Sequence, residues 1–209
     1  MKNNEIKLFP EHIYHIFTHA NGKENIFIKD DNYSFFLRRY EYFISPIAQT
    51  YAYCLMPNHL HLMVKIKDTN ELQMANKQFM TTRKVPVVEI AANGFSAFIS
   101  KVFGNLFSSY TQALNKEQDR KGSLFIPNFK RKLVDDQKYY TNLVHYIHNN
   151  PVHHGFARNM EAWKFSSYNS YFSDLTTKIA KAEVLNWFGD KQSFRDFHQS
   201  QKIDLSLDI

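Results

Sequence analysis

Cysteine, glycine and proline are all scarce in this sequence. The single cysteine, Cys54, excludes a disulfide within one chain and any zinc or iron–sulfur cluster built on cysteines. Only six glycines and six prolines argue against a collagen-like or low-complexity chain. No apolar run approaches the roughly 20 residues that cross a bilayer, and the opening segment lacks the apolar stretch of a signal peptide. We therefore expect a soluble, cytoplasmic protein.

Aromatic residues, in contrast, are abundant. Phe, Tyr and Trp make up 16% of the 209 residues, which supplies enough apolar surface for a real core and excludes global disorder. The length suits one domain, with or without a short appendage. The net charge of +6 is a mild basic excess that is compatible with an anionic partner.

The first third of the chain predicts strands and one helix. Alternating apolar residues indicate a strand over 12–19, and apolar residues at helical spacing predict a helix over 31–45. Two further strands, 47–55 and 59–66, are separated by a Met-Pro-Asn turn signal. We expect these two strands to form an antiparallel hairpin.

The rest of the chain alternates helices with irregular segments. Residues 67–94 are polar and predict an insertion or flexible loop, whereas 95–118 carry a continuous apolar stripe that indicates the clearest helix. A last strand is expected within 120–134. A helix over 136–150 should end where a proline follows, since the residue before proline avoids the helical region. A short helix is expected near 178–188. Interleaved helices and an antiparallel hairpin favour an α+β fold.

Two histidines share one face of the strand 59–66. Side chains alternate along a strand, so His59 and His61 point one way and the intervening leucines the other. Paired imidazoles of this kind can bind one divalent cation. The alternative is that both are polar residues on a solvated face of the sheet.

The helix 136–150 presents a phenol and an amide together. Its core side is formed by four residues: Tyr140, Leu143, Val144 and Ile147. Tyr146 and Asn150 lie one turn apart at the edge of that stripe. Alternatively, Tyr146 is an amphipathic tyrosine with a packed ring and a solvated hydroxyl, and Asn150 caps the helix.

Basic and aromatic residues are interleaved before that helix. This arrangement suits a surface that binds phosphates and stacks on bases, and its members are Arg120, Lys121, Phe125, Phe129, Lys130, Arg131 and Lys132. The alternative is a solvated basic face above two core phenylalanines.

Three stretches carry a resemblance to a known family. They are YCLMPNHLHLMV, GSLFIPNFKRKLV and YIHNNPVHHGFARNMEAWKFSSY, in that order along the chain. In their order and joint presence they resemble the single-tyrosine HUH endonucleases, specifically the REP-associated tyrosine transposases and their relatives. The resemblance spans roughly residues 10–172. It implies a transposase-like domain over 1–172, within which 67–94 is an insertion or loop, and a helical C-terminal extension over 173–209.

The resemblance also assigns roles to residues. It implies that His59, His61 and Asn150 bind Mg²⁺ or Mn²⁺, although some relatives carry Gln in place of Asn150. It places Tyr146 as the nucleophile, with Tyr139 and Tyr140 as nearby rivals. The fold it implies is ferredoxin-like, with an antiparallel sheet and helices packed on one face. Relatives include monomers and homodimers, and the sequence leaves that choice open.

The implied activity is metal-dependent nicking and strand transfer on single-stranded or hairpin DNA. A tyrosine would form a covalent 5′-phosphotyrosine and release a 3′-hydroxyl, so that rejoining needs no ATP. One alternative is a relaxase or replication-initiator nickase, which normally carries further domains. Another is a catalytically silent nucleic-acid-binding module of ferredoxin-like build. A zinc hydrolase is a third, and the sequence places no carboxylate close to the histidine pair as its general base.

Overall fold

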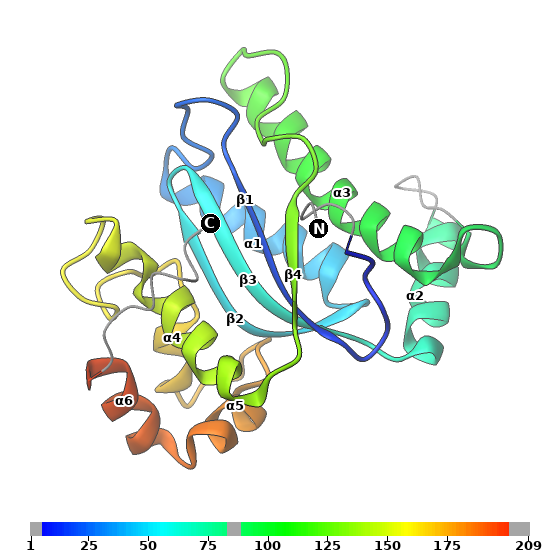
Figure 1. The fold of residues 1–209 in the computed structure, drawn as a ribbon. Coiled ribbons are helices and arrows are strands. Elements are labelled where there is room, and N and C mark those ends of the chain that lie inside the picture. The colour runs from blue at the N-terminus through cyan, green and yellow to red at the C-terminus, as the bar shows by residue number, and fades with distance from the viewer. Residues whose placement is uncertain (1–5, 83–88, 201–209) are drawn as a thin grey trace.

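Four antiparallel strands form one sheet in the order β2–β3–β1–β4 (Figure 1). The structure is a computed structural model that describes residues 6–82 and 89–200. The strands are β1 (Ile13–His19), β2 (Ala48–Met56), β3 (His59–Ile66) and β4 (Lys130–Val134). The helices are α1 (Asp30–Ile44), α2 (Thr69–Thr82), α3 (Ile90–Glu117), α4 (Gln137–His153), α5 (Lys181–Phe188) and α6 (Lys191–Ser200), with a 3₁₀ turn at Tyr168–Tyr171.

The order of the elements confirms the predicted α+β class. A β–α–β–β–α–β succession, in which α1 connects β1 to β2 and α3 leads into β4, produces the strand order of a ferredoxin-like sheet. The hairpin of β2 and β3 is confirmed, and it turns at Pro57 and Asn58. β1 lies between β3 and β4, so the two central strands are β3 and β1.

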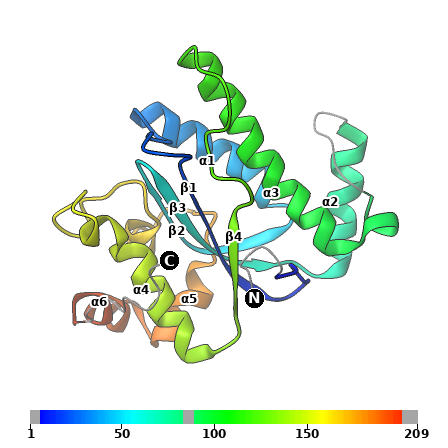
Figure 2. The same cartoon turned by 45° about the horizontal axis from the view of Figure 1, so that its top comes forward.

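Helices cover both faces of the sheet, which corrects the expectation that they pack on one face. Figure 2 shows α1 and α3 on one side of the sheet and α4, α5 and α6 on the other. The strands explain this arrangement, because they present apolar residues on both faces of the sheet. Leu62 and Val64 of β3 lie in the core beneath α1 and α3, whereas Met63 lies in the core beneath α4.

Residues 69–82 form helix α2, not the flexible loop that the polar composition predicted. Leu72 and Phe79 bury its inner side in the same core as α1 and α3. The predicted start of the next helix at 95 coincides with a break inside α3, where Gly94 has a positive φ of 75°. Residues 83–88, within the same expected loop, lie outside the described residues.

Helix α4 continues through Pro151 to His153, beyond its predicted end at 150. Pro151 has no amide hydrogen to donate to the carbonyl of Ile147, which costs one helical hydrogen bond, but the bonds that follow it are kept. The carbonyl of Asn150 accepts from the amide of His154 at 3.0 Å, and the carbonyl of Pro151 accepts from Phe156 at 2.8 Å. The side chains of three successive turns of α4 therefore stay in register past the proline.

The C-terminal segment contains two helices where the sequence predicted one. Val184 of α5 and Phe194 of α6 are buried in the core beneath α4. The second helix was missed because its few apolar residues stand among polar ones. Nowhere in the described part of the chain is a helix both long and apolar enough to span a bilayer.

Candidate active site

The two histidines of β3 lie on the face of the sheet that α4 covers. His61 pairs in register with Phe17 of β1, and His59 pairs with His19 at the end of both strands. His61 is buried, and burial lowers the pKa of its imidazole well below the usual value, with the charge of His15 as the next cause. A neutral imidazole keeps a lone pair with which to bind a cation.

His15 of β1 contacts His61 directly. Its Nε2 lies 2.9 Å from Nδ1 of His61, and the two rings stack with centroids 5.1 Å apart. Burial lowers the pKa of His15 to about 3. With both rings neutral, one ring donates the shared proton and the other accepts it. When His61 donates from Nδ1, its Nε2 is the acceptor that can bind a metal. The structure thus places His15 directly against the histidine pair.

Tyr146 and Asn150 approach the histidines from α4. The ring of Tyr146 is 3% exposed and meets His61 edge-on, at a centroid distance of 5.4 Å and an angle of 89°. Asn150 donates from Nδ2 to the carbonyl of Tyr146 at 3.2 Å. This bond turns Oδ1 of Asn150 toward His59, whose Nε2 lies 3.5 Å away. The structure thus brings together all four residues to which the sequence assigned chemistry.

A pocket of about 290 Å³ opens beside this group. Its walls come from β1, the β2–β3 turn, β3, α4 and the segment after α4: Phe17, Thr18, His19, Asn58, His59, His61, Tyr146, His154 and Phe156. The sequence reasoning missed His154, whose ring lies 4.9 Å from that of His59. The sequence did contain a signal for His154, because positions 146, 150 and 154 fall on one helical face if the helix continues past Pro151.

The rival tyrosines contact other parts of the molecule. The ring of Tyr140 lies 5.1 Å from that of Trp187 on α5. Tyr139 lies beneath Lys132, whose Nζ is 5.1 Å from its ring centroid. Both tyrosines stand about two turns before Tyr146 along α4. These contacts favour Tyr146 over either rival as the phenol that faces the histidines.

The basic and aromatic stretch divides into three parts. Phe125 and Phe129 are each only 6% exposed and belong to the core, which leaves their faces unavailable for stacking on bases. Lys130 and Lys132 lie opposite Phe17 and His15 in the β1–β4 register. Since paired residues share a face, these two lysines flank the pocket.

The remaining basic residues of the stretch lie away from the pocket. Arg120 pairs with Glu24 and donates to Asn115, whereas Lys121 is exposed. Arg131 is buried on the opposite face of β4, toward α3. The predicted DNA-contacting set is therefore not one surface.

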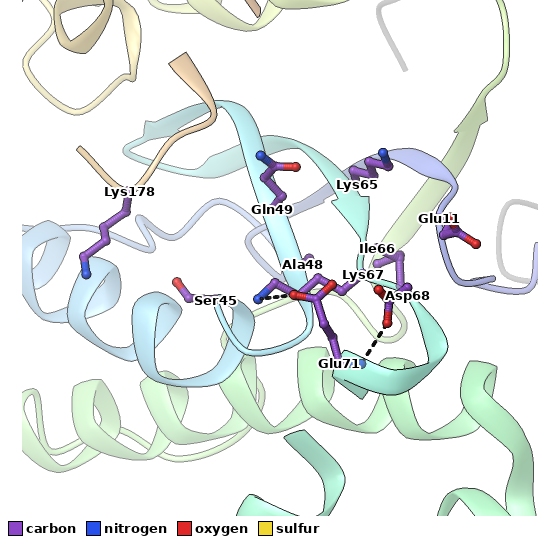
Figure 3. A pocket seen from close by; sticks show the side chains of 10 residues that line it. All are labelled: Glu11, Ser45, Ala48, Gln49, Lys65, Ile66, Lys67, Asp68, Glu71 and Lys178. Atoms are coloured by element: carbon purple, nitrogen blue, oxygen red, sulfur yellow. Dashed lines mark hydrogen bonds and ion pairs between the residues drawn. The ribbon is translucent and has the colours of Figure 1, made fainter. Parts of the chain in front are cut away.

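A larger hollow of about 470 Å³ lies at the other end of β3, around Lys65 and Lys67 (Figure 3). Acidic and basic residues line it in equal number, Glu11, Asp68 and Glu71 against Lys65, Lys67 and Lys178. Lys67 contacts Glu71 at 3.3 Å, and Asp68 accepts a hydrogen bond from the backbone amide of Glu71 at 2.8 Å. Because acidic and basic groups neutralise each other there, this hollow has no net charge to attract an anionic ligand.

The donor set of the histidine pocket suits a divalent cation. Within residues 6–82 and 89–200, no three His, Cys, Asp or Glu side chains cluster as metal ligands. Two imidazoles and the Asn150 amide oxygen nevertheless converge, and the 3.5 Å between His59 Nε2 and Asn150 Oδ1 is a spacing that two ligands of one ion can adopt. A set of two nitrogens and one oxygen fits Mg²⁺, Mn²⁺ or Zn²⁺.

Comparison with known proteins gives two relevant matches. No family model matches the chain. A protein of Haemophilus influenzae named as a REP-associated tyrosine transposase is 23% identical over 147 residues, which are 68% of this chain and 68% of that protein. A solved structure of a REP-associated tyrosine transposase bound to a REP hairpin gives a TM-score of 0.61 at 15% identity, covering 83% of this chain and 87% of that one. The first match confirms the resemblance that the motifs predict, and the second confirms the fold.

Proposed function

We propose that this relative of the REP-associated tyrosine transposases is itself a DNA transposase, which nicks and rejoins single-stranded or hairpin DNA. The observation that carries the proposal is the meeting of Tyr146 and Asn150 of α4 with His59 and His61 of β3 beside one pocket. The β3 pair and the α4 pair lie far apart in the sequence, and packing alone does not require a phenol, an amide and two imidazoles to converge.

Tyr146 is the proposed nucleophile. Its phenol oxygen attacks the scissile phosphorus and forms a 5′-phosphotyrosine, while the bond from phosphorus to the 3′ oxygen breaks. The phenol loses its proton and the departing 3′ oxygen gains one, so atoms and charge balance. The released 3′-hydroxyl, or that of another strand, can attack the phosphotyrosine in turn. Since one phosphodiester replaces another, the cycle needs no nucleoside triphosphate.

The histidines and Asn150 are the proposed ligands of Mg²⁺ or Mn²⁺. Bound there, the cation would offset the negative charge of the phosphate oxygens. The protein's own contribution is orientation. Asn150 is held by the carbonyl of Tyr146, and His61 by His15, so both ligands are fixed before substrate arrives. Lys130 and Lys132 add positive charge at the border of the pocket.

A covalent adduct tests this function. The protein is incubated with Mn²⁺ and 5′- or 3′-labelled DNA hairpins whose single-stranded flanks are randomised, and adducts are separated on a denaturing gel. We expect a labelled adduct that Tyr146→Phe abolishes. Tyr139→Phe and Tyr140→Phe serve as matched controls and should retain it.

The same gel distinguishes the alternatives. An adduct that persists in Tyr146→Phe would move the nucleophile elsewhere. If no adduct forms while the hairpins still bind, the catalytically silent binding module is favoured. Cleavage without any adduct, in protein purified with stoichiometric zinc, would favour a zinc hydrolase.

A further inference from the structure

We propose that a groove between α3 and the segment 122–131 binds phosphates of the unpaired DNA strand next to the scissile phosphate. This inference rests on the proposed function and extends its substrate site. The groove has a volume of about 550 Å³. Figure 1 shows the segment that forms its second wall turning back from the end of α3 to enter β4.

The α3 wall of the groove is uncharged, and apart from Phe107 it consists of glycine and polar residues. Ser100, Gly104, Ser108, Thr111 and Asn115 recur every three or four residues and so form one helical face. Among the described residues, Arg131 is the only charged one that borders the groove. Hydroxyl and amide groups of this kind donate hydrogen bonds to phosphate oxygens, and small side chains let a backbone approach closely.

Arg131 supplies the observation that points to an anion. It is 8% exposed, and its Nη1 donates to the hydroxyl of Ser100 at 2.8 Å. Its Cζ lies 4.3 Å from the centroid of the Phe129 ring, but among the described residues its buried Nε makes no hydrogen bond and no carboxylate forms an ion pair with it. A buried charge is normally paired. A phosphate in the groove would provide the missing counter-charge.

Thr18 connects the groove to the histidine pocket. It borders both hollows, and within the described part of the chain its buried hydroxyl also makes no hydrogen bond. Its neighbours in β1, Phe17 and His19, line the pocket on the other face of the sheet. A strand whose scissile phosphate lies beside Tyr146 would therefore reach the groove by passing the end of β1, without crossing the body of the protein.

Gly104 offers a sharp test, because a Cβ built on it meets nothing within 4 Å. We would compare Gly104→Glu with Gly104→Gln, which has the same shape without the charge. The probe is fluorescein-labelled dT12, and the reference is a blunt-ended DNA hairpin, both measured by fluorescence anisotropy at low salt. We expect Gly104→Glu to raise the Kd for dT12 on the order of tenfold over Gly104→Gln. The Kd for the blunt hairpin should change much less.

Arg131→Gln gives an independent readout. The slope of log K against log salt for dT12 should fall by about 0.7, which corresponds to one lost phosphate contact on a single strand. Should Arg131→Gln fail to fold, the Gly104 pair still tests the proposal, because a Cβ at position 104 meets nothing within 4 Å and the two variants differ only in charge. Equal Kd values for Gly104→Glu and Gly104→Gln would overturn the proposal.

The outcomes separate this proposal from the proposed function. If the Tyr146 adduct never forms but Gly104→Glu weakens dT12 binding, the groove is a single-strand site in a protein that is not a transposase. If the adduct forms and the two Gly104 variants bind dT12 equally, the transposase stands and the groove is not part of its substrate site.

Discussion

A chain of buried histidines behind α4 predicts that the protein loses stability in mild acid. His198 of α6 lies with Nδ1 2.8 Å from the carbonyl of Phe194, so this nitrogen carries the proton. Its Nε2 then accepts from Nδ1 of His148 at 3.0 Å, and Nε2 of His148 accepts from Ser167 at 2.8 Å. Both imidazoles are therefore neutral, and an added proton would break one of these bonds.

The magnitude follows from the pKa shifts. Burial lowers the pKa of His198 to about 3 and that of His148 well below its usual value. An unfolded histidine takes up a proton below a pH of about 6.5. Between these limits the unfolded state binds more protons, so the free energy of unfolding falls as the pH decreases. Each histidine contributes about 1.3 kcal/mol per pH unit, or roughly 2.6 kcal/mol for the pair between pH 5.5 and 4.5.

The assay is urea denaturation of the protein and of His198→Gln at pH 7.5, 5.5 and 4.5. The variant loses ring packing and should be about 1 kcal/mol less stable at pH 7.5. It also loses one titrating group, so its stability should fall less steeply, by about 1.3 kcal/mol per pH unit. The two curves should therefore cross in acid. His12→Gln is the matched control for loss of an imidazole that is exposed. Parallel curves for the protein and His198→Gln would refute the reasoning.

Three further changes test the packing and the site. His15→Leu should lower the affinity for Mn²⁺ about 10- to 100-fold by calorimetry, because the proposed metal ligand His61 loses the group that orients it. His15→Gln, which keeps an acceptor, should lose less affinity, and equal losses would contradict the orienting role. Gly189→Ala should lower the free energy of unfolding by about 1 kcal/mol in urea denaturation, because φ is 97° at this position. Gly104→Ala, where the new Cβ lies inside a helix and meets no atom within 4 Å, should raise the free energy of unfolding by about 0.5–1 kcal/mol. Changes of the same sign in both variants would contradict this reasoning. Tyr40→Phe removes a buried 2.7 Å hydrogen bond to Thr50 and should cost about 1 kcal/mol by thermal unfolding, with an unchanged melting temperature as the contrary result.

Much of the fold could be predicted from local patterns. The hairpin of β2 and β3 was readable because two apolar runs flank a short turn signal, and α1 and α3 because their buried residues repeat at helical spacing. The helices on the second face of the sheet could not be predicted. The strands carry apolar residues on both faces, and the sequence alone does not say which elements cover each face. α2 was missed because its few buried residues stand among polar ones.

The candidate site, like the fold, could be predicted from the sequence only in part. His59 and His61 could be paired from strand alternation, and Tyr146 with Asn150 from helical spacing, but their meeting depends on how α4 crosses the sheet. His154 was missed because the helix was predicted to end at residue 150, before this histidine. Phe125 and Phe129 looked suited to stacking on bases because a sequence does not reveal which aromatic rings are buried.

The histidine chain behind α4 has one more consequence. Helix α4, which carries Tyr146, packs between two layers: the sheet and its pocket lie on one side, and α5 and α6 lie on the other. His148, two positions after the phenol, is anchored from behind by His198. A shortened protein that stops at residue 172 would lose the contacts of α5 and α6 with α4, so these two helices support the proposed nucleophile from behind and are not a dispensable tail.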